Sequence, residues 1–78
     1  MSRYTKELEN GNTVAFGFDS ALGYFIDEFG PDKDGEDALV LSESSLLTGM
    51  GNGKMVELMK KYELPEAHIE RVVMDLPI

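Results

Sequence analysis

The chain turns back on itself at Asn10-Gly11, and the pairing of the segments on either side limits the folds open to it. Residues 3–9 (RYTKELE) and 12–18 (NTVAFGF) flank this dipeptide, which is a strong signal for a β-hairpin turn. A two-residue loop would pair Leu8 with Thr13. That register would split the large apolar side chains of the hairpin between the two faces of the sheet.

A three-residue loop over 9–11, with Gly11 in the left-handed bulge position, gives a different register. It pairs Tyr4 with Phe16 and Lys6 with Val14. One face of the hairpin then carries all of its large apolar side chains: Tyr4, Leu8, Val14, Phe16 and Phe18. A half-buried sheet needs one apolar face, so we predict the bulged turn.

The next apolar segment, residues 20–29, is compatible with either a helix or a strand. Leu22, Phe25, Ile26 and Phe29 follow helical spacing, and Gly30-Pro31 would end a helix. The segment is also rich in aromatic and β-branched residues, and Gly23 would weaken a helix by roughly 1 kcal/mol. A lone hairpin is only marginally stable, so we favour a third strand here.

A fourth strand is predicted over 37–43 (DALVLSE), after a loop of turn-forming residues. Two helices follow. The first carries Met55, Leu58, Met59 and Tyr62 on one stripe, and Asn52 or Gly53 lies near its N-cap. The second starts at Pro65, ends at Pro77 and carries Ile69, Val72, Val73 and Leu76; a short strand over 71–76 is the alternative.

These elements predict an α+β fold, in which a four-stranded, mostly antiparallel meander is followed by two C-terminal helices. Both helical stripes should pack on the face that holds Tyr4 and Phe16. The run GFDSALGYFIDEF, then ALVL, a glycine, a helix and a segment begun by proline resembles a group of small bacterial proteins. These have a Gly-aromatic-Asp turn before an aromatic strand. The resemblance spans residues 17–78 and implies the fold alone.

Length and composition restrict the class of protein. Seventy-eight residues support one domain, and the absence of cysteine excludes disulfides, a thiolate nucleophile and a cysteine-based zinc site. Residues 1–12 contain no apolar run, and no stretch reaches the roughly 18 apolar residues of a membrane span. We therefore expect a cytoplasmic protein without a cofactor.

The net charge of −8 is concentrated in the middle of the chain. Residues 19–45 contain eight acidic side chains and one basic one, Lys33, a net of −7. Such a field repels nucleic acid and anionic lipid, and it attracts cations or a basic protein surface. We therefore expect neither nucleic-acid nor membrane binding.

The run TGMGNGKM (48–55) resembles a phosphate-binding loop but departs from the pattern G-x-x-x-x-G-K-[ST] at two positions. Thr48 replaces the first glycine, and Met55 replaces the hydroxyl residue after the lysine. A helix start can still hold an anion weakly. The alternative that remains is an anion site at Gly51, Gly53 and Lys54.

The acidic loop over 27–37 (DEFGPDKDGED) invites a comparison with calcium-binding loops. An EF-hand with its glycine at Gly35 would begin at Gly30 and end at Leu41, where acidic ligands are required, so an EF-hand is excluded. A weak divalent-cation site remains as an alternative, with the ligands Asp32, Asp34, Glu36 and Asp37.

No constellation of residues indicates an enzyme. His68 is the only histidine, and it reads as a surface or boundary residue because no nucleophile motif accompanies it. Adjacent carboxylates such as Asp27 and Glu28 point to opposite faces of a strand. We expect no catalytic residue.

The leading hypothesis is therefore a small acidic accessory protein that binds another protein or a second copy of itself. The expected contacts are the uncovered sheet face and the residues Asp27, Asp32, Asp34, Glu36, Asp37 and Met50, the last only if it is exposed. One variant of the hypothesis is a DNA mimic, in which carboxylates imitate phosphates toward a basic groove. The rival class is the weak cation- or anion-binding module.

Overall fold

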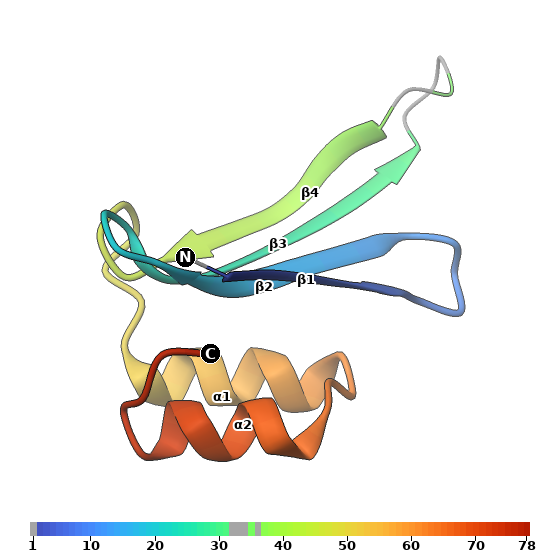
Figure 1. Cartoon of the computed structure of the whole chain (residues 1–78). Helices are drawn as coiled ribbons and strands as arrows, with labels where there is room; N and C mark the ends of the chain where they lie inside the picture. The colour runs from blue at the N-terminus through green and yellow to red at the C-terminus, as the bar shows by residue number, and fades with distance from the viewer. Residues whose placement is uncertain (1, 32–34, 36) are drawn as a thin grey trace.

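A computed structural model describes residues 2–31, 35 and 37–78, except for the side chain of Asp37, and shows a four-stranded sheet followed by two helices (Figure 1). All neighbouring strands are antiparallel, in the order β1-β2-β3-β4. The predicted α+β fold is thereby confirmed. The elements are β1 (Ser2–Glu7), β2 (Thr13–Asp19), β3 (Gly23–Pro31), β4 (Asp37–Ser44), α1 (Asn52–Lys61) and α2 (Glu66–Val73).

The hairpin formed by β1 and β2 has the bulged register. Tyr4 is opposite Phe16, and Lys6 is opposite Val14. Gly11 has a φ of 89°, which is the left-handed conformation that this loop requires. The prediction is confirmed, and its physical reason holds: Val14 and Phe16 are both buried on the face that carries Tyr4.

The segment after this hairpin is a strand, as predicted. β3 pairs with β2 from Gly23 to Phe29, and Tyr24 and Ile26 alternate with less buried neighbours. Asp19 prepares the turn, because its Oδ1 accepts hydrogen bonds from the backbone N–H groups of Ala21 (2.7 Å) and Leu22 (3.3 Å). Strand pairing therefore prevails over the helical spacing of the same apolar residues.

The edge strand β4 contains a β-bulge. Glu28 is opposite Leu41 and Phe29 is opposite Leu39, so Val40 is the extra residue on β4. A bulge bends an edge strand and interrupts its ladder, which hinders pairing with the edge of another sheet. At the other end of β4, the carbonyl oxygen of Ser44 accepts hydrogen bonds from the backbone N–H groups of Thr48 and Met50.

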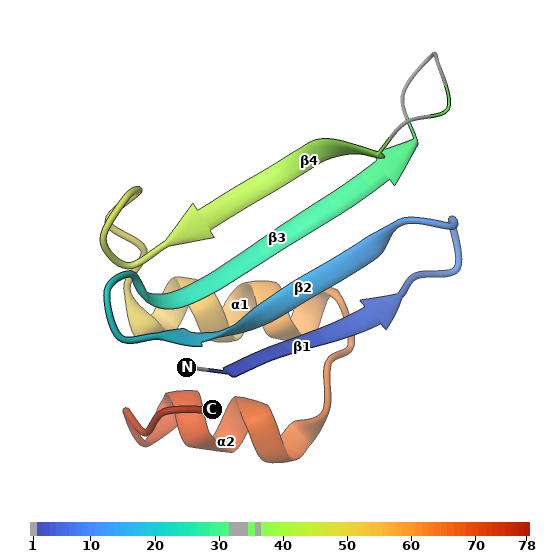
Figure 2. The ribbon, with the colours of Figure 1, turned by 45° about the horizontal axis from the view of Figure 1, so that its top comes forward.

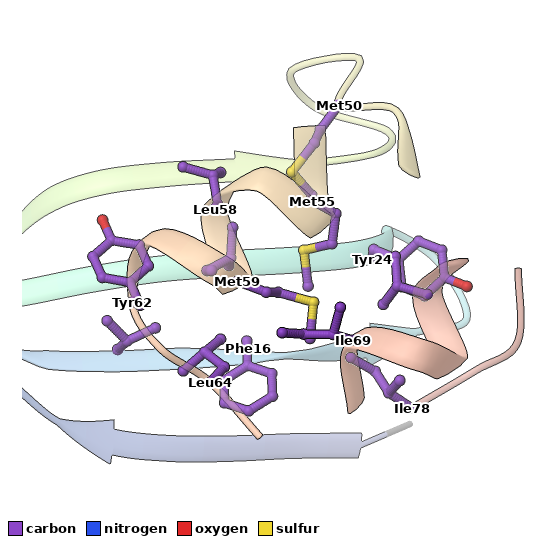
Figure 3. Close-up of a cluster of buried hydrophobic side chains, with 13 residues drawn as sticks. Phe16, Tyr24, Met50, Met55, Leu58, Met59, Tyr62, Leu64, Ile69 and Ile78 are labelled. Atoms are coloured by element: carbon purple, nitrogen blue, oxygen red, sulfur yellow. The ribbon is translucent and has the colours of Figure 1, made fainter. Parts of the chain in front are cut away.

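Both helices lie on the same side of the sheet (Figures 1 and 2). Met55 and Met59 of α1 are fully buried between the helix and the sheet, and Ile69 of α2 is buried as well (Figure 3). Val72 of α2 is also fully buried. The prediction that both helices pack on the Tyr4/Phe16 face is confirmed. The buried apolar cluster comprises Val14, Phe16, Tyr24, Ile26, Met50, Met55, Leu58, Met59, Tyr62, Leu64, Ile69, Val72 and Ile78.

The start of α1 agrees with the prediction, and the end of α2 differs from it. α1 begins at Asn52, with Gly51 as its N-cap, so Asn52 lies next to the cap. α2 ends at Val73, and Val73 and Leu76 are exposed (65% and 41%) rather than buried.

The early end of α2 has a local cause. Asp75 adopts a left-handed φ of 59°, and the N–H of Leu76 donates to the carbonyl of Arg71, which closes the helix before Pro77. The chain then returns to the sheet, where Tyr24 Oη donates to the carbonyl of Leu76 and Ile78 is buried. The alternative strand over 71–76 is not formed.

The glycine at position 17 allows β1 to approach β2 closely, and substituting it tests this approach. A Cβ atom at this position would overlap the carbonyl oxygen of Ser2. We expect Gly17→Ala to lower the free energy of unfolding by roughly 1–3 kcal/mol, measured by urea denaturation. The matched control is Gly53→Ala in the first turn of α1, where an added Cβ meets nothing within 4 Å. It should be neutral or stabilise by up to about 1 kcal/mol, and equal losses in the two variants would contradict the close approach.

Candidate functional site

The face of the sheet opposite the helices is the main candidate surface, and we call it the open face. Side chains alternate along a strand, so the residues between the core positions of each strand point to it. Both ribbon views place α1 and α2 on the other side. By this alternation and the strand register, the open face carries Arg3, Thr5, Glu7, Thr13, Ala15, Gly17, Asp19, Phe25, Asp27, Phe29, Leu39, Ser42 and Ser44.

A pocket of about 430 Å³ lies at the end of the open face that contains the β2–β3 turn and the β4–α1 turn. We call it the Phe25 pocket. Its apolar lining is Leu22, Phe25 and Leu47, and its charged lining is Arg3, Asp19, Asp27 and Glu43. Phe25 is opposite Gly17 on one side and Ser44 on the other. Because both of these neighbours are small, the half-buried ring has no large side chain directly opposite it on either adjacent strand.

The carboxylates around the Phe25 pocket are held in place by hydrogen bonds. Asp27 Oδ1 accepts from Ser42 Oγ at 2.7 Å, across the β3–β4 pair. Asp19 is fixed through Oδ1 in the β2–β3 turn, and Glu43 Oε2 accepts from Thr48 Oγ1 at 2.9 Å. By the strand register Glu43 is opposite Ile26, so its side chain is on the helix-facing side, and Asp19 and Asp27 are the carboxylates of the lining that lie on the open face. Among the described lining residues Arg3 is the one basic residue, so negative charge predominates here.

The turn after β4 forms one wall of the pocket. Ser44 Oγ accepts a hydrogen bond from the N–H of Leu47 at 3.0 Å, and Thr48 Oγ1 accepts one from the N–H of Ser44 at 3.0 Å. These bonds hold a tight turn that leaves Leu46 and Leu47 exposed (66% and 74%). The hydrogen-bonded turn therefore holds two large apolar side chains at the surface, and Leu47 lines the pocket.

Glu28 forms a second polar feature, inside the layer between sheet and helices. It is buried, and its two carboxylate oxygens accept hydrogen bonds from Tyr62 Oη (2.6 Å) and Asn12 Nδ2 (2.7 Å). These bonds, that of Tyr62 first, lower the pKa of Glu28. Burial and the Glu28 carboxylate raise the pKa of Tyr62 to about 12. An ionised carboxylate bound by two donors positions β3, the β1–β2 loop and the end of α1.

Sequence reasoning did not single out Glu28. In the sequence, Glu28 is one member of an adjacent acidic pair with Asp27, and alternation along a strand places the two on opposite faces. A signal was present, because Glu28 follows Tyr24 and Ile26 at two-residue spacing on the helix-facing side of β3. An acidic residue at a core position needs polar partners.

The predicted contact residues fall into three groups. Asp27 lies on the open face, beside the Phe25 pocket. Asp32, Asp34 and Glu36, which are also the main candidates for a cation site, lie outside the described residues, and Asp37 is described only by its backbone as the first residue of β4.

Met50 was expected to be a partner contact if exposed, and this condition fails. Its side chain is 5% exposed and belongs to the apolar core (Figure 3). The reason is that the chain enters α1 directly beneath the sheet, so a large apolar side chain at this point is buried. Met50 is therefore removed from the candidate contacts.

The remaining candidates are the anion site at the start of α1, a metal site and His68. Gly51, Gly53 and Lys54 are exposed at the start of α1, where the N-cap has no side-chain hydrogen bond. In the part of the chain that the structure describes, no group of three or more His, Asp or Glu side chains could hold a metal ion. His68 packs its ring against Tyr4 and Phe16, with centroid distances of 4.3 and 5.4 Å, which suits a boundary residue.

Comparison of the chain with models of known protein families, with curated proteins and with solved structures gave no match. The resemblance to small bacterial proteins therefore stays a prediction. Among the described residues, neither helix has the length and apolarity needed to cross a membrane.

The Glu28 hydrogen bonds predict a pH-dependent contribution to stability. Glu28→Gln replaces an ionised acceptor, and we expect it to lower the free energy of unfolding at pH 7 by about 1.5–3 kcal/mol. The folded pKa of Glu28 is lowered. The contribution of this carboxylate is therefore present above its unfolded pKa and is lost as the pH falls through the folded pKa.

Urea denaturation of wild type and Glu28→Gln at pH 7 and at pH 3 measures this effect. The gap between the two proteins should be wide at pH 7 and should narrow at pH 3. The same substitution at Glu57, which is exposed on α1, is the control and should leave the urea midpoint unchanged. A gap of equal size at both pH values would show that Glu28 does not act through its charge.

Proposed function

We propose that this protein is non-catalytic and acts by binding another protein through the open face of the sheet. The observation that carries the proposal is the Phe25 pocket, where apolar side chains and fixed carboxylates meet on a sheet face opposite both helices. Pockets with a few placed polar groups among apolar walls are typical of binding sites. The cytoplasmic location expected from the sequence is part of the same proposal.

Exposed apolar side chains support a protein as the ligand. Leu39, Val40, Leu46 and Leu47 are each more than half exposed, and all belong to β4 or to the turn after it. Phe25 and Phe29 lie on the same face, on the neighbouring strand. A group of large apolar residues rimmed by polar ones is characteristic of protein–protein contact surfaces.

Charge indicates the chemistry of the partner. Residues 27–37 contain six acidic side chains and one lysine, and they begin at the open face with Asp27. A second copy of the chain would bring the same acidic residues to this surface, on a molecule whose net charge is −8. Like charges repel, so the open face is complementary to a partner with a basic surface rather than to itself. The DNA-mimic interpretation is the special case in which that partner binds nucleic acid.

Site-specific photo-crosslinking tests the proposal. A photoreactive residue in place of Thr5, on the open face, should crosslink to a basic protein in an extract of the cells that make this chain. The same residue in place of Glu57, on the outer side of α1, is the control and should give little product. The crosslinked peptide is identified by mass spectrometry.

The alternatives give distinct products. Crosslinks from Thr5 to the chain itself would show that the open face forms a homodimer. Equal capture of the same protein from both positions would show that the open face is not the binding surface.

A further inference from the structure

We infer that the Phe25 pocket receives the side chain of an arginine from the partner. This inference rests on the proposed function and specifies the residue by which the partner would be recognised. Three properties of the pocket carry it: its size, the half-buried aromatic ring of Phe25 in its lining, and the sign and placement of its charges.

The size and apolar walls fit the stem of one long side chain. A volume of about 430 Å³ is enough for a single side chain but is small for a compact domain element such as a helix. Leu22 and Leu47 contribute apolar walls from the two turns at this end of the sheet. The methylene groups of an arginine can pack on such walls while the guanidinium keeps its polar contacts.

The aromatic ring favours a planar cation. Phe25 is opposite Gly17, which has no side chain, and opposite Ser44, which has a short one. A guanidinium can stack on an aromatic face, whereas an ammonium group acts as a compact, strongly hydrated point charge. The ring therefore favours arginine over lysine.

The carboxylates favour a donor of several hydrogen bonds. Asp27 follows Phe25 on the same face of β3, and Asp19 lies across the β2–β3 pair at the turn. Ser42 and the backbone of the turn hold these carboxylates in place through the Oδ1 atoms. Because a guanidinium has five N–H donors, it can reach a carboxylate while it lies on the ring.

Arg3 is the opposing charge in the pocket. It lies on β1, opposite Gly17 and one strand further from Phe25 than Gly17 is. Its cation should weaken the binding of a second cation, although the acidic lining residues outnumber it. Neutralising an acidic lining residue should therefore weaken the binding of a cation, whereas neutralising Arg3 should strengthen it.

Chemical-shift titration of the ¹⁵N-labelled protein tests the inference without the partner. The probe is Nα-acetyl-arginine amide, and the matched control is Nα-acetyl-citrulline amide, which has nearly the same shape but no charge. We expect the arginine probe to bind with a dissociation constant on the order of 1 mM. Its shifts should be confined to the amides around Leu22, Phe25, Ser42 and Leu47, and the citrulline probe should bind at least about fivefold more weakly.

Two variants test the charges separately. Asp27→Asn should weaken binding of the arginine probe at least about threefold, and Arg3→Gln should strengthen it. Glu57→Gln, which removes one negative charge on the outer side of α1, is the control and should change little. Equal binding of citrulline, shifts spread over the acidic surface, or weaker binding by Arg3→Gln would each overturn the inference.

The arginine-probe titration and the Thr5 crosslinking experiment can fail independently of each other. If the arginine probe binds in the Phe25 pocket but Thr5 crosslinks to no protein, the proposed protein-binding function fails and the pocket assignment stands. If Thr5 crosslinks to a basic protein but the arginine probe leaves the pocket amides unshifted, the function stands and the arginine assignment fails.

Discussion

One constraint governs this structure: the helices bury only one side of the sheet. The register of the β1–β2 hairpin puts Val14 and Phe16 on the same face as Tyr24 and Ile26. The apolar stripes of α1 and α2 cover that face. Met55 and Met59 of α1 are fully buried there (Figure 3), and so is Val72 of α2. Both helices lie on this side of the sheet, so neither covers the opposite face. The open face is therefore a consequence of how the core is built, and not of one local irregularity.

The acidic side chains of β3 are also divided between the helix-covered face and the open face. Glu28 points into the interlayer space, where hydrogen bonds from Tyr62 and Asn12 stabilise its ionised carboxylate and fix the end of α1 against β3. Asp27, its neighbour, points the other way and lies beside the Phe25 pocket. Two adjacent carboxylates thus have separate roles, one in stability and one on a candidate binding surface, because successive side chains of a strand alternate between faces.

Much of the fold was predictable because hydrophobic pattern and turn chemistry agreed in the first half of the chain. The bulged turn at Gly11, a strand within the segment 20–29 (β3, Gly23–Pro31) and the burial of Met55 and Met59 all follow from which face must be apolar. The predictions were wrong where a local feature decided the outcome. Periodicity alone could not show that Asp75 would take a left-handed conformation and leave Leu76 exposed, or that Met50 would be buried beneath the sheet. The Phe25 pocket depends on side chains from all four strands and two turns, and no single stretch of sequence reveals that juxtaposition.

The most direct test of the central claim compares two charge reversals in affinity for the crosslinked basic partner. Asp27→Lys on the open face and Glu57→Lys on α1 change the net charge equally, so they differ only in position. Calorimetry at physiological salt should show at least about tenfold weaker binding for Asp27→Lys, a loss of about 1.4 kcal/mol, and a change within about threefold for Glu57→Lys. Equal weakening by both variants would show that only net charge matters and would contradict a binding site on the open face.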